Sequence, residues 1–189
     1  MFNERILCAG FGGQGIMSLG QLLAYGGMSE ERHVSWIPSY GPEMRGGTAY
    51  CSVVLSEKEV GSPIVTTNAT TAVIMNTPSL IKFEKSVISG GIILVNSSLV
   101  NRRVTRKDVN VYYIPAVELA GECGNQQAAN IVMLGAYLAL TQAVTEKSII
   151  SALPKVFGEK PKKFIDLNRR ALELGQKAVL GHGPKLAAA

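Results

Sequence analysis

Residues 6–16 have the sequence Ile6-Leu7-Cys8-Ala9-Gly10-Phe11-Gly12-Gly13-Gln14-Gly15-Ile16. The apolar run before Gly10 is typical of a strand that is buried on both faces. From Ile16 onward, apolar residues recur at the spacing of a helix. The glycines between the two elements fit the pattern G-x-G-x-x-G. This order of strand, glycine turn and helix predicts the first unit of an open α/β sheet, in which ligands bind at the carboxyl ends of the strands.

The same alternation continues along the chain. Further strands are expected at residues 34–37, 48–55, 71–75, 92–95 and 111–114, with helices opened by Pro78 and at 126–143, from 145 and at 160–179. Pro38 is expected to end the second strand. Strands that alternate with helices predict a single-domain, three-layer α/β/α fold with a Rossmann-like, mostly parallel sheet.

The composition narrows the class of protein. Of the 189 residues, 47% are hydrophobic and 17% are charged, against a typical charged fraction of about 25%. These values exclude a disordered chain, a collagen and a coiled coil, and the low charge suggests a surface partly covered by other subunits. The uncharged stretches 6–29 and 123–145 are interrupted by glycines or by amide side chains, so we expect no membrane span.

Positive charge is concentrated in the second half of the chain. Residues 1–100 hold 6 lysines and arginines against 7 acids, whereas residues 101–189 hold 13 against 7. One cluster comprises Arg102, Arg103, Arg106 and Lys107, and another extends over residues 155–170. Such a surface can meet an acidic protein or a phosphorylated ligand, or can simply be solvated. Without interleaved aromatic residues it gives no support for a nucleic-acid partner.

The cysteines point to a reducing compartment. Cys8, Cys51 and Cys123 are far apart, odd in number and outside any CxxC motif, which argues against disulfides, a zinc site or an iron–sulfur cluster held by this chain alone. No export signal is recognisable, so we expect a cytoplasmic protein. Residues 184–189 have the composition of a vector-derived tail, which leaves 1–183 as the natural domain.

The glycine turn allows several functions. A dinucleotide site requires an acidic residue at the end of the second strand for the ribose hydroxyls, but that strand ends with Ile37-Pro38-Ser39-Tyr40. In a second interpretation the glycines bind nothing and only allow a tight turn and close packing of the helix on the sheet. The remaining alternatives are a phosphate-bearing ligand, which the following helix N-terminus would favour, and a partner chain docked on the turn.

A second loop is expected beside the glycine turn. Residues 39–47 follow the second strand with the sequence Ser39-Tyr40-Gly41-Pro42-Glu43-Met44-Arg45-Gly46-Gly47. The guanidinium of Arg45 suits a phosphate or a carboxylate. The two histidines, His33 and His182, form no catalytic arrangement with other residues in the sequence. We therefore expect no complete catalytic apparatus and no metal site on this chain.

Together, residues 10–16 and 39–47 resemble the gamma subunit of 2-oxoacid:ferredoxin oxidoreductases, of the 2-oxoglutarate or branched-chain type. The likeness covers nearly the whole chain and extends to the pair Ser62-Pro63. It implies a multi-subunit enzyme that decarboxylates a 2-oxo acid oxidatively to its acyl-CoA and passes the electrons to ferredoxin. In that family the thiamine diphosphate and the iron–sulfur clusters lie mainly on the alpha, beta and delta subunits, and the gamma subunit is associated with coenzyme A.

The resemblance also implies roles for residues. The expected cofactor-binding residues are Gly10, Gly12, Gly13, Gln14, Gly15, Tyr40, Glu43 and Arg45, and none of them is expected to be catalytic. The chain is not expected to be active alone. Two other functions remain open on the sequence: a free-standing Rossmann-like NAD(P)-binding oxidoreductase, and a binding module that docks an acidic protein on its basic C-terminal third.

Overall fold

A computed structural model describes residues 2–41 and 47–180 of the protein. Its strands are β1 (Asn3–Phe11), β2 (His33–Tyr40), β3 (Thr48–Ser56), β4 (Ala69–Ile74), β5 (Val87–Asn96) and β6 (Asn110–Ile114). Its helices are α1 (Ile16–Ser29), α2 (Thr77–Phe83), α3 (Ala116–Glu122), α4 (Ala129–Thr141), α5 (Glu146–Phe157) and α6 (Lys162–Leu180), with short 3-10 turns η1 (Glu84–Ser86) and η2 (Gln126–Ala128). The expected tail, 184–189, lies outside the described residues.

The six strands form one sheet in the order β2-β3-β1-β4-β5-β6. The pairs β1–β4, β4–β5 and β5–β6 are parallel, whereas β3 runs antiparallel to both β1 and β2. The predicted mostly parallel α/β sheet is therefore confirmed. The hairpin partner β3 lies between β1 and β2, so β2 is an edge strand. The carboxyl ends of β1, β2, β4, β5 and β6 meet at one edge of the sheet, called here the ligand edge.

The expectation that Pro38 ends the second strand was wrong, because β2 continues to Tyr40. The amide of Gly41 donates to the carbonyl of Thr48 at 2.8 Å, and hydrogen-bonded pairs alternate along an antiparallel ladder. Pro38, opposite Cys51, therefore occupies a non-hydrogen-bonded pair, where its missing N–H faces the free edge. An edge strand tolerates proline at such a position.

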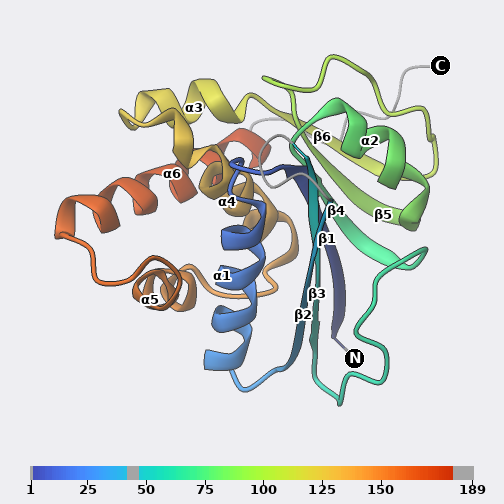
Figure 1. The fold of residues 1–189 in the computed structure, drawn as a ribbon, viewed down its shortest axis with the longest axis horizontal. Helices are drawn as coiled ribbons and strands as arrows, with labels where there is room; N and C mark the ends of the chain where they lie inside the picture. Colours follow the sequence, from blue (N-terminus) through green and yellow to red (C-terminus); the bar gives the residue numbers. More distant parts are fainter. Residues whose placement is uncertain (1, 42–46, 181–189) are drawn as a thin grey trace.

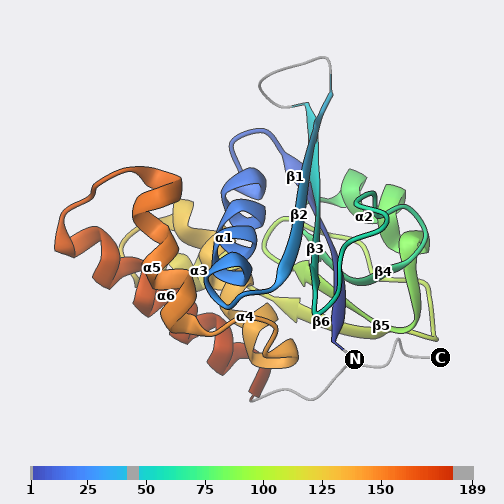
Figure 2. The same cartoon turned by 90° about the horizontal axis from the view of Figure 1, so that it is seen from below.

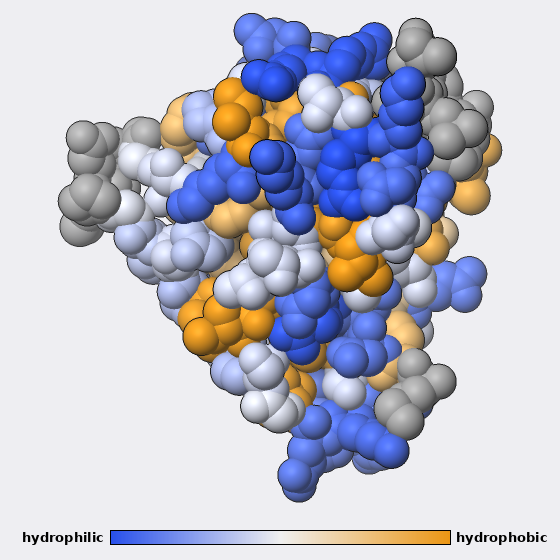
Figure 3. Space-filling model, turned by 90° about the vertical axis from the view of Figure 1, so that its right-hand side faces the viewer, coloured by the Kyte–Doolittle hydropathy of each residue, from blue (hydrophilic) through white to orange (hydrophobic). Residues whose placement is uncertain are grey.

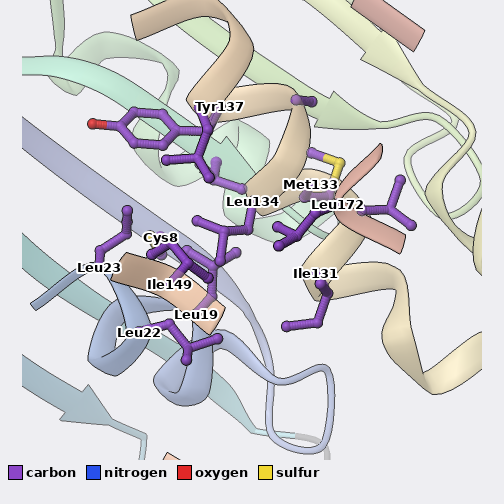
Figure 4. Close-up of a cluster of buried hydrophobic side chains, with 14 of the residues drawn as sticks. Cys8, Leu19, Leu22, Leu23, Ile131, Met133, Leu134, Tyr137, Ile149 and Leu172 are labelled. Atoms are coloured by element: carbon purple, nitrogen blue, oxygen red, sulfur yellow. The ribbon is translucent and has the colours of Figure 1, made fainter. Parts of the chain in front are cut away.

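Helices cover the two faces of the sheet unequally (Figures 1 and 2). The helices α1, α3, α4, α5 and α6 lie on one face, and α2 lies on the other together with the connections 57–68 and 97–109. The larger core cluster is on the first face, where side chains from β1, α1, α4, α5 and α6 meet around Leu19, Leu134 and Tyr137 (Figure 4). A smaller core on the α2 face includes Leu80, Val100 and Val104.

Two glycines let α4 and α6 cross at very short range. A Cβ atom built on Gly135 would lie 2.1 Å from the carbonyl oxygen of Leu172, and one built on Gly175 would lie 1.9 Å from that of Val132. The backbones of the two helices are therefore in direct contact. This crossing fixes α6 over α4 and, with it, the wall of the cavity described below.

Most predicted elements are present with shifted ends. The helix expected at 126–143 begins as η2 and ends at Thr141, where Gln142 adopts a left-handed conformation. The helix opened by Pro78 is α2, whose N-cap is the side chain of Asn76, accepting from the amide of Ser79 at 2.9 Å. Helix α3 was not expected from the sequence. None of the helices in the described ranges is long and apolar enough to cross a membrane.

Candidate functional site: a glycine-loop cavity at the ligand edge

The turn from β1 to α1 depends on glycine at two positions. Gly13 has φ 96° and Gly15 has φ 72°, both in the region that side chains disfavour. Gly15 is the N-cap of α1 and offers no side chain to cap it. The first amides of a helix have no acceptor within the helix. The first turn of α1 therefore presents free N–H groups at the ligand edge, an arrangement that suits an anion.

The side chain of Gln14 holds this turn from inside. Its Oε1 accepts from the amide of Phe11 at 2.7 Å and from Nδ2 of Asn76 at 3.4 Å, and its Nε2 donates to the carbonyl of Met75 at 3.4 Å. The carboxamide thus connects the ends of β1 and β4. A Cβ atom on Gly10 would lie 2.6 Å from this Oε1. Gly10 therefore makes room for Gln14, and both residues shape the turn.

Asn130 joins the glycine turn to the start of α4. Its Nδ2 donates to the carbonyl of Gly15 at 3.1 Å, and a Cβ atom on Gly15 would lie 2.4 Å from that nitrogen. The side chain is buried, so this hydrogen bond fixes the turn against a rigid helix. Gly15 is required here both by its backbone conformation and by the close approach of Asn130.

A cavity of about 390 Å³ opens beside the turn. Gly13, Gly15 and Ser18 line it from the turn and α1. The opposite wall comes from the start of α4 and from α6 with the residues before it, and its polar members are Asn125, Gln127, Asn130, Lys160 and Asn168. Phe157, Phe164 and other apolar residues complete the lining. The lining contains one cation and no carboxylate, which suits an anionic ligand with an apolar portion.

The second loop meets the glycine turn at one described contact. The amide of Gly12 donates to the carbonyl of Gly47 at 3.1 Å, so the two loops are neighbours at the ligand edge, as the sequence predicted. Tyr40 ends β2 with 65% of its surface exposed, and it does not line the cavity. Glu43 and Arg45 lie outside the described residues.

The predicted site residues thus divide into groups. Gly13 and Gly15 line the cavity, Gly10, Gly12 and Gln14 build the turn, and Tyr40 ends β2 outside the cavity lining. Sequence reasoning missed the far wall, above all Lys160. That lysine belongs to the basic run 155–170, which was noted only as a charge cluster. Nothing in local spacing places it opposite a turn that lies far from it in the sequence.

The groups that line the cavity are suited to binding an anion. Within residues 2–41 and 47–180, no group of three or more His, Cys, Asp or Glu side chains is arranged to hold a metal ion. The end of β2 carries Ser39 and Tyr40 rather than the acidic residue that a dinucleotide site uses. The arrangement offers free helix amides, side-chain amides and an ammonium group, which together can hold phosphate.

The comparisons with known proteins agree with one another. A sequence profile described as "pyruvate ferredoxin/flavodoxin oxidoreductase" matches residues 5–178. Ketoisovalerate oxidoreductase subunit VorA of Methanothermobacter thermautotrophicus is 45% identical over 172 residues, which are 90% of this chain and 35% of VorA. The chain therefore spans about a third of that relative. 2-Oxoglutarate synthase subunit KorC of Methanocaldococcus jannaschii is 34% identical over 84% of this chain and 88% of KorC.

A solved structure gives the same assignment. The gamma subunit of a keto/oxoacid ferredoxin oxidoreductase from Geobacter sulfurreducens superposes with a TM-score of 0.79 at 26% identity, covering 95% of this chain and 99% of that subunit. The fold, the sequence profile and the relatives all support the family resemblance that residues 10–16 and 39–47 indicate. The chain belongs to the pyruvate ferredoxin/flavodoxin oxidoreductase family.

Proposed function

We propose that the chain is the gamma-type subunit of a 2-oxoacid:ferredoxin oxidoreductase, which converts a 2-oxo acid and coenzyme A to an acyl-CoA with release of carbon dioxide and two electrons. The observation that carries the proposal is the family match over residues 5–178 together with the full-length likeness to a gamma subunit. The NAD(P)-dependent alternative is not favoured, because β2 ends without an acidic residue.

The proposed substrate is a branched-chain 2-oxo acid, with 2-oxoglutarate as the second candidate. The support is the higher identity to VorA, a ketoisovalerate oxidoreductase subunit, than to KorC, a 2-oxoglutarate synthase subunit. In this proposal, which follows the family resemblance, the thiamine diphosphate and the iron–sulfur clusters belong to alpha-, beta- and delta-type partner chains, and ferredoxin is the electron acceptor.

The glycine-loop cavity is proposed to receive a phosphate of coenzyme A. Free amides at the start of α1 would donate to the phosphate and the ammonium of Lys160 would pair with its charge, and the neighbouring Phe157 and Phe164 would contact a less polar part of the molecule. Gly13, with open space above its Cα, would let the ligand approach the backbone. The chain would thus position coenzyme A for chemistry performed on its partners.

The compartment proposed is the cytoplasm. Cys8 and Cys51 are buried and Cys123 is half-buried, and all three are free thiols. Free thiols are usual where glutathione and thioredoxin keep proteins reduced.

Lys160→Ala in the assembled enzyme tests the cavity. Loss of a charge-assisted hydrogen bond costs about 1.5–3 kcal/mol, so we expect the KM for coenzyme A to rise about tenfold or more while the KM for the 2-oxo acid stays constant. Lys163→Ala is the matched control, since Lys163 is exposed at the start of α6 and does not line the cavity. An unchanged KM for coenzyme A in Lys160→Ala, or an equal rise in Lys163→Ala, would contradict the assignment.

A further inference from the structure

A second polar cavity lies at the ligand edge, on the opposite face of the sheet from the glycine-loop cavity. It measures about 380 Å³ and is lined by Ser97, Val100, Asn101, Arg102, Arg103 and Tyr113. Ser97 directly follows β5, and Tyr113 is near the carboxyl end of β6. Val100 belongs to the core on the α2 side. The cavity therefore occupies the position where open α/β sheets bind ligands, but nothing in the glycine turn contributes to it.

The segment that carries the arginines is firmly attached to the rest of the molecule. The amide of Val104 donates to the Tyr113 hydroxyl at 2.9 Å. Oε1 of the buried Glu84 accepts from the amides of Thr105 at 2.5 Å and Arg106 at 2.9 Å. The hydroxyl of Thr77 donates to Oδ1 of Asn101 at 3.0 Å. These bonds hold the segment in one conformation, so a ligand would not have to order it.

The four basic residues of the predicted cluster have different roles. Arg106 serves the fold: its guanidinium pairs with Asp108 and donates to the carbonyls of Glu84 and Val87. Hydrogen bonding to Arg106 holds the pKa of Asp108 below its ordinary value. Lys107 is exposed and does not line the cavity. Arg102 and Arg103 remain as the two cations that face the cavity.

Neither of these two guanidiniums is neutralised within the described residues, where the one ion pair joins Arg106 to Asp108. Arg103 stacks on the ring of Tyr113 with its Cζ 4.7 Å from the ring centre, which orients its N–H groups. The nearby carboxylates bind other groups. Glu84 accepts hydrogen bonds from backbone amides, Asp108 pairs with Arg106, and Glu118 accepts from the hydroxyl of Ser98. The cavity lining thus contains two arginines that no carboxylate pairs within the described residues.

The remaining polar groups of the lining are donors as well. Oδ1 of Asn101 accepts from the hydroxyl of Thr77, so the amide nitrogen of Asn101 is left to donate. The Tyr113 oxygen already accepts from Val104, which leaves its O–H to donate, and Ser97 contributes a hydroxyl. The lining contains no carboxylate. Figure 3 views the α2 side of the molecule, and its surface there is largely hydrophilic with scattered apolar patches.

We propose that this cavity, formed by Ser97, Asn101, Arg102, Arg103 and Tyr113, is an anion site that binds the phosphate group of a small phosphorylated molecule. Two guanidiniums, an amide and two hydroxyls provide more donors than one carboxylate can accept, whereas the three terminal oxygens of a phosphate monoester can use them. A volume near 380 Å³ is at the small end of ligand cavities. A low-molecular-weight phosphate ester fits it better than an extended chain.

The test is a titration of the full-length chain with glycerol 3-phosphate at constant ionic strength, followed by NMR of the ¹⁵N-labelled protein. The backbone signals of residues 97–104 and the Nε–H signals of Arg102 and Arg103 should shift saturably. Arg102→Ala should weaken this binding at least tenfold, because it removes a charge-assisted contact. Lys107→Ala is the control, since it removes the same charge from the same segment outside the cavity, and it should change the affinity less than twofold.

Lys160→Ala separates this site from the glycine-loop cavity and should leave the shifts of residues 97–104 unchanged. Succinate and an acidic peptide are titrated in parallel and should bind at least tenfold more weakly than glycerol 3-phosphate. Absence of saturable shifts at residues 97–104, or equal weakening by Arg102→Ala and Lys107→Ala, would overturn the site. Equal or tighter binding of succinate or the peptide would overturn its assignment to phosphate.

Discussion

Glu4 is a half-buried carboxyl group at the end of the sheet opposite the ligand edge. Its Oε2 accepts from the hydroxyls of Thr70 at 3.0 Å, Tyr137 at 3.3 Å and Thr71 at 3.4 Å. Burial raises the pKa of Glu4 above its ordinary value, and the three hydrogen bonds offset only part of that rise. Folding therefore makes Glu4 hold its proton more tightly than it does in the unfolded chain.

This environment gives stability a definite pH dependence. A carboxyl with a raised pKa holds its proton in the folded state after the unfolded chain has lost it. The free energy of unfolding should therefore fall as pH rises from the ordinary pKa of Glu4 through its raised one. Glu4→Gln should remove that fall, so that the variant gains stability relative to the wild type on going from pH 4 to pH 7. Urea unfolding of both proteins across this range measures it.

Glu30 provides a control of opposite sign. Burial by itself raises its pKa, but hydrogen bonds from the amide and hydroxyl of Thr145, at 2.7 and 2.8 Å, outweigh that effect and lower it. The stabilisation from Glu30 is present above the ordinary pKa and is lost as pH falls through the lowered one. Glu30→Gln should thus lose stability relative to the wild type as pH rises. Two variants with slopes of the same sign would contradict this account.

Single residues also show what the sequence could and could not reveal about the site. The place of Gly13 and Gly15 in the turn could be predicted from the sequence, because a tight turn between a strand and a helix needs positive φ angles, which glycine adopts readily. The inward carboxamide of Gln14 could not, because its partner Met75 is brought near only by the pairing of β1 with β4. The bond from Asn130 to the carbonyl of Gly15 could not be predicted either, because 115 residues separate the two positions in the sequence.

The crossing of α4 and α6 depends on two glycines that have no room for a side chain. Gly135→Ala and Gly175→Ala would each force a methyl group into a backbone carbonyl of the other helix. Overpacking of this kind typically costs about 1–3 kcal/mol and sometimes more. We expect each variant to lose about 3 kcal/mol of unfolding free energy in chemical denaturation.

Gly121 is the matched control for these two glycines. It lies in α3, where an added Cβ would come no closer than 3.8 Å to another atom, the Cγ of Gln126. Glycine within a helix costs about 0.5–1 kcal/mol relative to alanine, so Gly121→Ala should be neutral or stabilising. A loss in Gly121→Ala as large as in Gly135→Ala would show that the close backbone contact is not the cause.

At the level of elements, the periodicity of apolar residues located the strands and all the longer helices. The antiparallel insertion of β3 between β1 and β2 could not be predicted, since strand pairing is set by contacts between distant segments rather than by local pattern. Pro38 was misinterpreted for the same reason: its effect depends on which side of β2 has a neighbour. Helix α3, with 7 residues, is too short to show a helical repeat in the sequence.

At the scale of the whole molecule, the two cavities that we propose as anion sites lie along one edge of the sheet. The glycine-loop cavity lies on the face covered by α1, α4 and α6, and the arginine-lined cavity lies on the face covered by α2. In the proposed assembly, this chain holds coenzyme A in place and the oxidation takes place on its partner chains.

If this chain works as part of a 2-oxo acid oxidoreductase, as proposed, its partner chains and their activity should accompany it through purification. The chain is affinity-purified under mild conditions from its native cells, and the eluate is assayed for coenzyme A-dependent dye reduction with a panel of 2-oxo acids. We predict co-purifying chains with iron–sulfur absorbance and thiamine diphosphate, and highest activity with a branched-chain 2-oxo acid. A colourless chain that purifies alone and is inactive with every 2-oxo acid would contradict the account.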